Sequence, residues 1–257
     1  MTMVTTNWSG LGQRFRKEVA MVSCQPFWCK KRVDGNLKLT PIAIRTKKNT
    51  KVQKQVPCLN LNRMNFLAHI YLSFDEPQIS LGNFFADHVK GNKFKHFPDA
   101  IQKGILLHRE IDTFTDSHPI PKQSSKRLHK NYSHYSRVIV DIFYDHFLAK
   151  NWSHYSNVPL DVFVGDFYDL LQKNFELLPL STQRMMPYMI ADNWLLNYAN
   201  LEGISNVLNG MNRRTQNRSK MNLAIVDLQE HYDAFEQEFT DFFKELITFS
   251  RLKFEYL

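Results

Sequence analysis

After residue 64 the large apolar side chains follow a helical period and not the alternation of strands. Close to the C-terminus they recur at three- and four-residue steps along about two dozen residues, which is typical of one face of an amphipathic helix. These side chains are Leu228, Tyr232, Phe235, Phe239, Phe242 and Leu246. Glycine and proline are sparse in this region, and no repeat is visible. We therefore expect an all-α fold, a helical bundle closed by this last helix.

The same spacing predicts the helices that precede it. Asp99 is a suitable N-cap after Pro98 for a helix that ends before Pro119. One side of that helix carries Ile101, Ile105, His108 and Ile111. Further helices are expected over residues 137–152, 161–175, 185–197 and 201–211. In the first of these, Val138, Ile142 and Phe143 are expected to face inward.

Composition divides the chain near Met64. Residues 1–63 hold 13 Lys and Arg against two Asp and Glu, whereas residues 64–257 hold 20 against 23, so the formal net charge of +8 originates in the first part. The first part shows no sustained period, and we expect it to be a basic extension that does not pack. It could bind nucleic acid or anionic lipid, act as a targeting peptide, or precede a true start at Met64. We favour the last reading, with a helical domain over residues 64–257.

The sequence disfavours a membrane-spanning protein, a secreted protein, a disulfide framework and a zinc site. No apolar stretch approaches the length of about 18 residues of a membrane span, and no secretory signal is recognisable. All three cysteines lie before residue 64, so the part expected to fold contains no disulfide framework. Cys24 and Cys29 have no second pair of ligands nearby and are a weak zinc signal. A soluble protein in the reducing cytoplasm is expected.

Acidic and imidazole side chains fall at spacings that place pairs on one helical face. His108, Asp112 and Asp116 are four residues apart in succession, and Asp141 and Asp145 repeat that spacing. His146 follows Asp145 but points about 100° away around the helix. A single pair of this kind is usually a surface contact or a solvated helix position. The spacing alone therefore supports a metal site only weakly.

Two further polar residues lie in apolar runs, where a buried polar group needs a partner. His69 lies within the run 66–72, and Asp87 ends the run 81–86. Taken alone, His69 fits a hydrogen-bonded core histidine better than a ligand. Several carboxylates buried together need a cation, and imidazole with carboxylate and water suits Mn²⁺, Mg²⁺ or Fe²⁺. Such an ion would favour hydrolysis of a phosphoester.

Several motifs, taken together and in order, resemble the bacterial acyl carrier protein phosphodiesterase family. They are MNFLAH at 64–69, LGNFFAD at 81–87, KG at 90–91, GILLHREIDTFTDSHP at 104–119 and DIFYDHFLA at 141–149. The segments 207–211 and 228–243 also resemble the C-terminal part of that family. The resemblance covers residues 64 to about 250, which is nearly all of the part expected to fold.

The resemblance implies an α-helical fold that diverged from the HD-domain metal phosphohydrolases. It also implies hydrolysis of the phosphodiester between 4′-phosphopantetheine and a serine of holo-acyl carrier protein, giving apo-acyl carrier protein. Mn²⁺ is the implied ion, with Mg²⁺, Fe²⁺ or Co²⁺ as alternatives. The implied metal ligands are His69, Asp87, His108, Asp112, Asp141 and Asp145, and the implied catalytic residues are Asp87, His69, Arg109 and His146. Among these, Asp87 is the first choice for an essential carboxylate, and Arg109 is expected to hold the phosphate.

The chain departs from the family pattern in two places. Residues 1–63 have no counterpart, and His88 stands where family members commonly carry an aromatic residue. No His-Asp dipeptide occurs in the chain, so the plain HD signature is absent.

Two basic segments match the acidic character of acyl carrier proteins. Residues 122–137 carry five Lys and Arg and no acid, and residues 212–222 carry four and no acid. Both could steer an acidic protein, or both could be ordinary solvated surface. The partner that the resemblance implies is acyl carrier protein, without a membrane and without nucleic acid. Two alternatives remain open: an HD-like hydrolase of another substrate such as a nucleotide, and a non-catalytic helical module that binds nucleic acid.

Overall fold

The structure, a computed structural model, describes residues 28–33, 36–41 and 65–257. The chain divides into two compact units, Met1–Gln53 and Lys54–Leu257. The described residues of the first unit form an antiparallel hairpin of two strands, β1 (Trp28–Val33) and β2 (Asn36–Pro41). The prediction about residues 1–63 concerns mostly residues outside the described part, and it stays a prediction.

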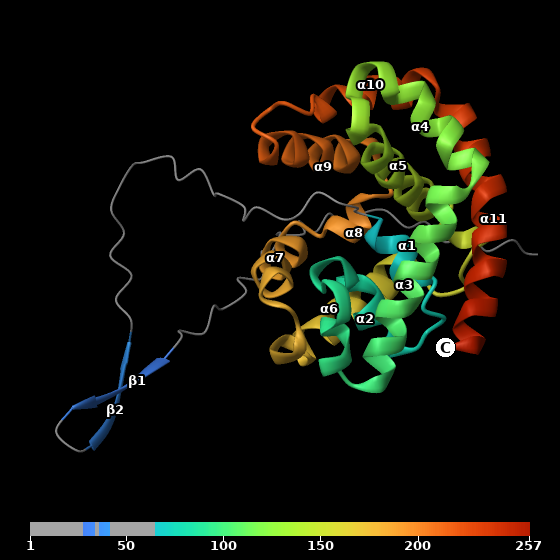
Figure 1. The fold of residues 1–257 in the computed structure, drawn as a ribbon. Helices are drawn as coiled ribbons and strands as arrows, with labels where there is room; N and C mark the ends of the chain where they lie inside the picture. The colour runs from blue at the N-terminus through green and yellow to red at the C-terminus, as the bar shows by residue number, and fades with distance from the viewer. Residues whose placement is uncertain (1–27, 34–35, 42–64) are drawn as a thin grey trace, which may run out of the picture. The chain divides into compact units, whose positions relative to one another are not determined.

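In the second unit, every regular element of residues 65–257 is helical, which confirms the all-α prediction for this unit (Figure 1). The α-helices are α1 (Phe66–Tyr71), α2 (Pro77–Phe85), α3 (Asp99–Ser117), α4 (Pro119–Tyr132), α5 (Ser136–Lys150), α6 (Leu160–Lys173), α7 (Leu180–Ala191), α8 (Trp194–Asn197), α9 (Leu201–Arg214), α10 (Ala224–Glu230) and α11 (Tyr232–Tyr256). Short 3₁₀ helices connect them at η1 (Ala86–His88), η2 (Gly91–His96), η3 (Ser133–Tyr135), η4 (Trp152–His154), η5 (Phe175–Leu177) and η6 (Met221–Leu223). None of the described helices is both long and apolar enough to cross a membrane.

The long helix α11 closes the bundle, as the C-terminal periodicity predicts. Figure 1 shows it along one side of the unit, and it packs against α3, α4 and α5. The side chains of its apolar stripe, Phe235, Phe239, Phe242 and Leu246, are almost fully buried. One expected helix is two, however, because the backbone breaks at His231 (φ −118°, ψ 28°) between α10 and α11.

Helices α2 and α3 approach each other closely because a glycine on each faces the other backbone. A Cβ atom on Gly82 would collide with the carbonyl oxygen of Ile101, and one on Gly104 would collide with that of Ile79. Both glycines are buried inside regular helices, where glycine costs about 1 kcal/mol relative to alanine. The close approach brings the backbone of α2 within hydrogen-bonding distance of side chains on α3.

The inward faces are as predicted, but several helix boundaries differ. Ile101, Ile105, Ile111 and His108 are buried on α3, as are Val138, Ile142 and Phe143 on α5. Asp99 is the first residue of α3 and not its N-cap, a position that Pro98 occupies. The expected helix 185–197 is two helices, α7 and α8, separated by Asn193 in the left-handed region.

The sequence pattern does not predict helix α4, because a proline after a helical pattern also marks the end of a helix. In the structure Pro119 is the first residue of a new helix, where the missing N–H of proline costs nothing. His118 caps α4, since its Nδ1 accepts a hydrogen bond from the Ile120 N–H at 3.3 Å.

Candidate metal centre

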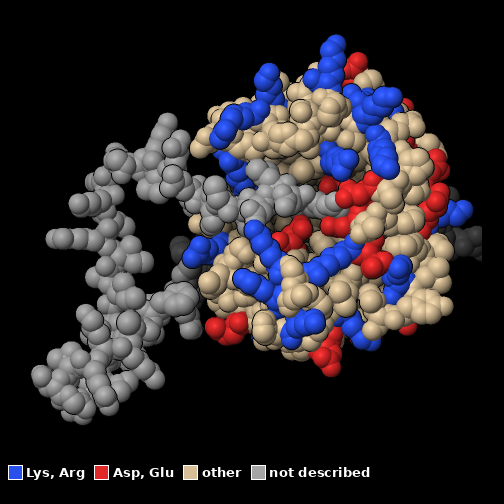
Figure 2. All heavy atoms as spheres, in the orientation of Figure 1, with Lys and Arg blue, Asp and Glu red and all other residues tan. Residues whose placement is uncertain are grey.

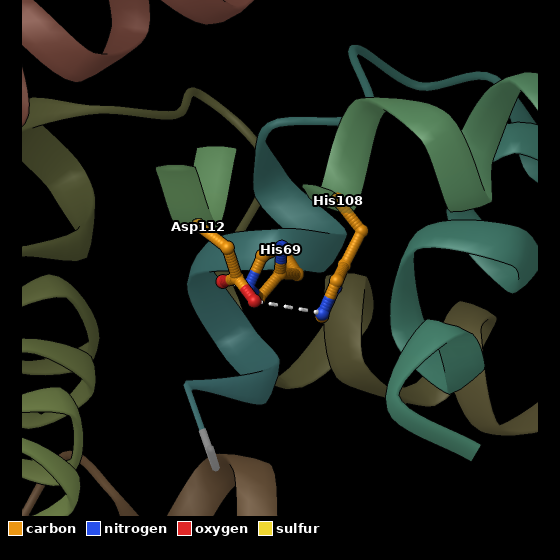
Figure 3. Close-up of side chains that lie close together, drawn as sticks. All are labelled: His69, His108 and Asp112. Atoms are coloured by element: carbon orange, nitrogen blue, oxygen red, sulfur yellow. Dashed lines mark ion pairs between the residues drawn. The ribbon is translucent and has the colours of Figure 1, made fainter. Parts of the chain in front are cut away.

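Three side chains from two helices converge to form a compact polar group, which we call the HHD group: His69 on α1 and His108 and Asp112 on α3 (Figure 3). One ligand atom from each lies within 4.8 Å of the others. The Nε2 atom of His69 is 3.5 Å from Asp112 Oδ1, and the Nε2 atom of His108 is 3.3 Å from Asp112 Oδ2. The two imidazole rings stack with their centroids 4.0 Å apart. The helical spacing predicted the pair on α3, and the fold adds the histidine from α1.

A buried carboxylate from a third helix holds α1 in place. Asp145 on α5 is fully buried, and its two oxygens accept hydrogen bonds from the backbone N–H groups of Leu67 and Ala68 at 3.0 and 2.9 Å. These N–H groups lie in the first turn of α1, where they have no partner within the helix. His69 follows directly, so Asp145 fixes the backbone that carries the first histidine.

Asn83 on α2 orients both histidines. Its Oδ1 lies 2.7 Å from the Nδ1 of His69, and its backbone carbonyl oxygen lies 2.9 Å from the Nδ1 of His108. The amide orientation is fixed because its Nδ2 donates to the His69 carbonyl oxygen and to Ser73 Oγ. The two Nδ1 atoms therefore face Asn83 Oδ1 and the Asn83 carbonyl oxygen, which can only accept a hydrogen bond. Each Nδ1 must carry a proton, and a ring without a second proton turns an Nε2 lone pair toward Asp112.

The two buried Nε2 atoms are consequently left without a hydrogen-bond partner among the described residues. A lone pair facing a carboxylate oxygen is favourable only if a proton or a cation lies between them. Burial alone would lower the pKa of His108, but Asp112 and Asp87 outweigh it and raise that pKa to about 10. Burial and the neighbouring His108 lower the pKa of His69. A proton can therefore satisfy one imidazole, but two stacked imidazolium rings would repel each other.

A divalent cation fits this arrangement better than a proton does. Burial raises the pKa of Asp112, but the histidines outweigh it and hold the pKa below its usual range, so the residue is a carboxylate at neutral pH. Two imidazole nitrogens and a carboxylate, with each Nδ1–H held by an oxygen of the surrounding shell, form a donor set that Mn²⁺, Fe²⁺ and Zn²⁺ accept. Adjacent ligands of a six-coordinate ion are about 3 Å apart, close to the separations in the HHD group.

Asp87 borders the HHD group from η1. Its Oδ1 is 3.5 Å from the Nε2 of His108, and its side chain is 25% exposed, compared with 5% for that of His108. It is thus the more exposed of the two carboxylates next to His108, since the side chain of Asp112 is 18% exposed. The structure therefore brings together four of the predicted site residues: His69, Asp87, His108 and Asp112.

Comparison with known proteins gives a family for this chain. The family model described as acyl carrier protein phosphodiesterase matches residues 64–246. The chain belongs to the acyl carrier protein phosphodiesterase family. This confirms the resemblance stated from the sequence motifs.

Curated members of the acyl carrier protein phosphodiesterase family align over most of their length. The acyl carrier protein phosphodiesterase of Pectobacterium atrosepticum is 31% identical over 189 residues, which are 73% of this chain and 98% of the relative. That of Photorhabdus laumondii is 32% identical over 181 residues, 70% of this chain and 91% of the relative. That of Salmonella agona is 33% identical over 187 residues, 72% of this chain and 96% of the relative. No solved structure matches the chain significantly.

Arg109 is also among the predicted site residues, and the structure places its guanidinium on the chain segment after Asp87. Its Nη2 donates to the carbonyl oxygens of Val89 and Gly91, at 3.3 and 2.8 Å. The same guanidinium lies 5.0 Å from the ring centroid of Phe94. These contacts fasten that segment to α3, and the phosphate-holding role that the resemblance implies for Arg109 stays a prediction.

The predicted residues of α5 are not part of the HHD group. Asp145 directs its carboxylate to the N-terminus of α1, and burial raises its pKa well above the usual value. His146 uses both ring nitrogens elsewhere: Nδ1 lies 2.7 Å from the Tyr198 carbonyl oxygen, and Nε2 lies 2.8 Å from the Tyr232 hydroxyl. Asp141 lies one helical turn before Asp145 on the same helix. Asp141 and Asp145 do lie on one helix at a four-residue spacing, but this spacing does not show which other helix their face contacts.

Sequence reasoning gave no role to Asn83 or to His88. Asn83 lies in the apolar run that ends at Asp87, so the argument that a polar group in such a run needs partners applies to it as well. His88 Nδ1 lies 2.6 Å from the Thr182 hydroxyl, a contact that joins η1 to α7. The sequence gives no signal for that pairing of residues 94 positions apart.

Proposed function

We propose that this protein is a metal-dependent phosphodiesterase that hydrolyses holo-acyl carrier protein to apo-acyl carrier protein and 4′-phosphopantetheine. Family membership supports the substrate, since the curated relatives carry the name acyl carrier protein phosphodiesterase. The observation that carries the metal dependence is the pair of buried Nε2 atoms directed at Asp112, with both Nδ1–H groups held by Asn83.

In this proposal His69, His108 and Asp112 hold the ion. A divalent cation at this position supplies Lewis acidity to a phosphoryl oxygen and lowers the pKa of a water molecule. Asn83 holds the Nδ1–H of both imidazoles, so that each ring keeps one orientation with its Nε2 toward the ion and no ring rotation accompanies binding. Burial of the two rings limits the access of bulk water and strengthens each electrostatic interaction in the group.

Asp87 takes the proton of the attacking water in this mechanism. Its carboxylate lies at the edge of the HHD group and reaches solvent, so it can accept a proton and release it afterwards. Water attacks phosphorus, the bond between phosphorus and the serine oxygen breaks, and the serine oxygen leaves and takes up a proton. The water oxygen remains on 4′-phosphopantetheine, and the serine hydroxyl remains on the carrier protein.

The proposal includes four finer assignments. The ion is Mn²⁺, which imidazole with carboxylate and water suits, with Mg²⁺, Fe²⁺ or Co²⁺ as alternatives. The fold is a divergent relative of the HD-domain phosphohydrolases, which is supported by a His, His and Asp set carried on helices. The protein acts in the cytoplasm. Its partner is acyl carrier protein, without nucleic acid or membrane.

The test is mass spectrometry of purified holo-acyl carrier protein after incubation with the enzyme and Mn²⁺. The carrier is expected to lose the mass of 4′-phosphopantetheine, and a chelator is expected to block the loss. The variant Asp112→Asn should abolish the reaction. Asp116→Asn is the matched control, since it lies one turn further on α3 and pairs with Arg137 at 3.8 Å.

Asp87→Ala tests the proposed proton acceptor and should abolish release of 4′-phosphopantetheine in the presence of Mn²⁺. Release by Asp87→Ala at the wild-type rate would remove this role. Hydrolysis of nucleotides without hydrolysis of holo-acyl carrier protein would contradict the proposed substrate. Full activity in the presence of chelator would contradict the proposed metal dependence.

A further inference from the structure

A short basic segment follows Asp87 directly. We call residues 90–96 the lysine segment; it contains Lys90, Lys93, Lys95 and His96, and all four are exposed. No acidic residue occurs between Asp87 and Asp99. Gly91 begins η2 with a φ of +56°, a conformation that favours glycine. The segment therefore presents cationic side chains at the border of the candidate metal centre.

Both ends of the lysine segment are fastened to the helices that carry the site. Arg109 binds the carbonyl oxygens of Val89 and Gly91 at its start, and its guanidinium lies over Phe94. At its end, Gln102 on α3 donates to the Phe97 carbonyl oxygen at 2.8 Å. Because Arg109 follows His108 directly in α3, the segment keeps a fixed position relative to the HHD group.

The lysines of this segment have no ion-pair partner within the described part of the chain. Two arginines of the basic segment 122–137 differ, since Arg127 pairs with Glu238 at 2.6 Å and Arg137 pairs with Asp116. Figure 2 shows basic side chains bordering the acidic ones in the middle of the displayed face. The lysine segment therefore offers positive charge that the described residues do not neutralise.

The proposed reaction places a strong constraint on where the carrier protein can dock. The bond that breaks joins phosphorus to the serine oxygen, so it lies at the surface of the carrier and not at the far end of the 4′-phosphopantetheine arm. The carrier surface around this serine must therefore reach the border of the HHD group. Lys90 is three residues after Asp87, so their Cα atoms are at most about 11 Å apart.

We propose that the lysine segment is a docking surface for the acidic carrier protein and that Arg109 is the residue that positions it. This inference rests on the proposed function, because the function supplies the identity of the partner. Acyl carrier proteins are small and acidic, and a cationic surface beside the site would steer them and orient the serine. Arg109 thus acts through the segment, in place of the phosphate contact that the sequence predicted.

The test measures binding of fluorescently labelled apo-acyl carrier protein to the full-length chain by anisotropy, at low and at physiological ionic strength. Apo-carrier lacks the phosphodiester, so binding is read separately from catalysis. The double variant Lys93→Glu/Lys95→Glu should weaken binding by about tenfold or more and flatten its salt dependence. The matched control is Lys126→Glu/Lys130→Glu on α4, where both lysines are also exposed. It should change binding much less.

Arg109→Gln distinguishes positioning from phosphate binding. If Arg109 positions the segment, this variant also weakens binding of apo-carrier, which carries no phosphate. If Arg109 only holds phosphate, apo-carrier binding stays at the wild-type level and the proposed role is wrong. Thermal melting of each variant checks that the fold is retained, and Arg109→Lys should recover part of the binding.

Several outcomes would overturn the docking proposal. One is an affinity for apo-carrier in Lys93→Glu/Lys95→Glu that equals that of the wild type, and another is an equal loss of affinity in the α4 control. The others are no binding of apo-carrier by the wild type at low salt, and tighter binding of a single-stranded RNA of equal charge. Failure of the proposed function looks different. The wild type would then bind apo-carrier through the lysine segment and still release no 4′-phosphopantetheine from holo-carrier.

Discussion

Replacing Asn83 should separate metal affinity from fold stability. Asn83→Leu keeps the approximate size of the side chain but removes the Oδ1 that accepts from the Nδ1 of His69 at 2.7 Å. The backbone carbonyl that accepts from His108 remains. The variant therefore releases one of the two imidazoles. Loss of such an outer-shell partner lowers metal affinity roughly 10- to 100-fold, which is about 1.4 to 2.7 kcal/mol.

Asn83→Leu also destabilises the fold, and the hydrogen bonds that it removes set the size of the loss in unfolding free energy. A buried donor left without a partner costs about 1–3 kcal/mol, and the Nδ1–H of His69 becomes such a donor. The His69 carbonyl oxygen loses the Asn83 amide but keeps its bond from Ser73 Oγ at 2.9 Å. We therefore expect the free energy of unfolding to fall by about 2–4 kcal/mol, measured by urea denaturation.

Ser73→Ala is the matched control. It removes two hydrogen bonds of the same network, from Ser73 Oγ to His69 and from Asn83 to Ser73 Oγ, but leaves the contact between Asn83 Oδ1 and the imidazole. It should reduce stability by about 1–2 kcal/mol without changing metal affinity. Affinity is measured by isothermal titration calorimetry with Mn²⁺. If Asn83→Leu folds too poorly, Asn83→Asp keeps the acceptor and should retain metal binding.

The reasoning is refuted if Asn83→Leu folds and binds Mn²⁺ as tightly as the wild type. It is also refuted if Ser73→Ala loses as much affinity as Asn83→Leu. Either result would mean that orientation of the imidazoles does not depend on the amide of α2.

Other predictions concern the fold that surrounds the site. Gly82→Ala should lower the free energy of unfolding in urea by about 1–3 kcal/mol, because its Cβ meets the α3 backbone. Gly165→Ala on α6, where a Cβ meets nothing, should be neutral or stabilising by up to about 1 kcal/mol. Equal effects of the two changes would contradict the close approach of α2 and α3. Burial raises the pKa of Glu238, but hydrogen bonds from Arg127 and other donors outweigh it and lower the pKa below 4.5. This carboxylate therefore stabilises the fold above about pH 4.5 and loses that effect as the pH falls. Glu238→Gln should make the free energy of unfolding less dependent on pH below about 5, and an unchanged pH profile would contradict this. Asp145→Ala should destabilise the fold by about 2–4 kcal/mol and lower Mn²⁺ affinity, because it frees the first turn of α1; wild-type stability would contradict the anchoring role.

Much of the helical architecture could be predicted from periodicity, and its failures have local physical causes. The stripe of α11 was visible because Phe235, Phe239 and Phe242 recur at helical steps over many turns. The break at His231 was not visible, because Leu228 and Tyr232 on its two sides keep a four-residue step. A proline after a helical pattern marks a helix end, but Pro119 both follows α3 and begins α4.

The candidate site could be predicted where its residues are local in sequence. His108 and Asp112 share a face of α3, so spacing was sufficient for that pair. The same spacing gave Asp145 a similar role, but this residue meets the N-terminus of α1 instead. Spacing fixes which side chains lie on one face, and only the packing of helices fixes what that face contacts. Asn83 shows the same limit, because its partners lie on α1 and α3.

The most direct test of the account is pulsed electron paramagnetic resonance of Mn²⁺ added to the metal-free protein. The spin echo of bound Mn²⁺ should be modulated by the nitrogen nuclei of two coordinated imidazoles. In His69→Gln and in His108→Gln, only one imidazole should remain in the signal. A wild-type protein whose bound Mn²⁺ shows no imidazole nitrogen, or that binds no divalent ion at all, would contradict a metal centre built from His69, His108 and Asp112.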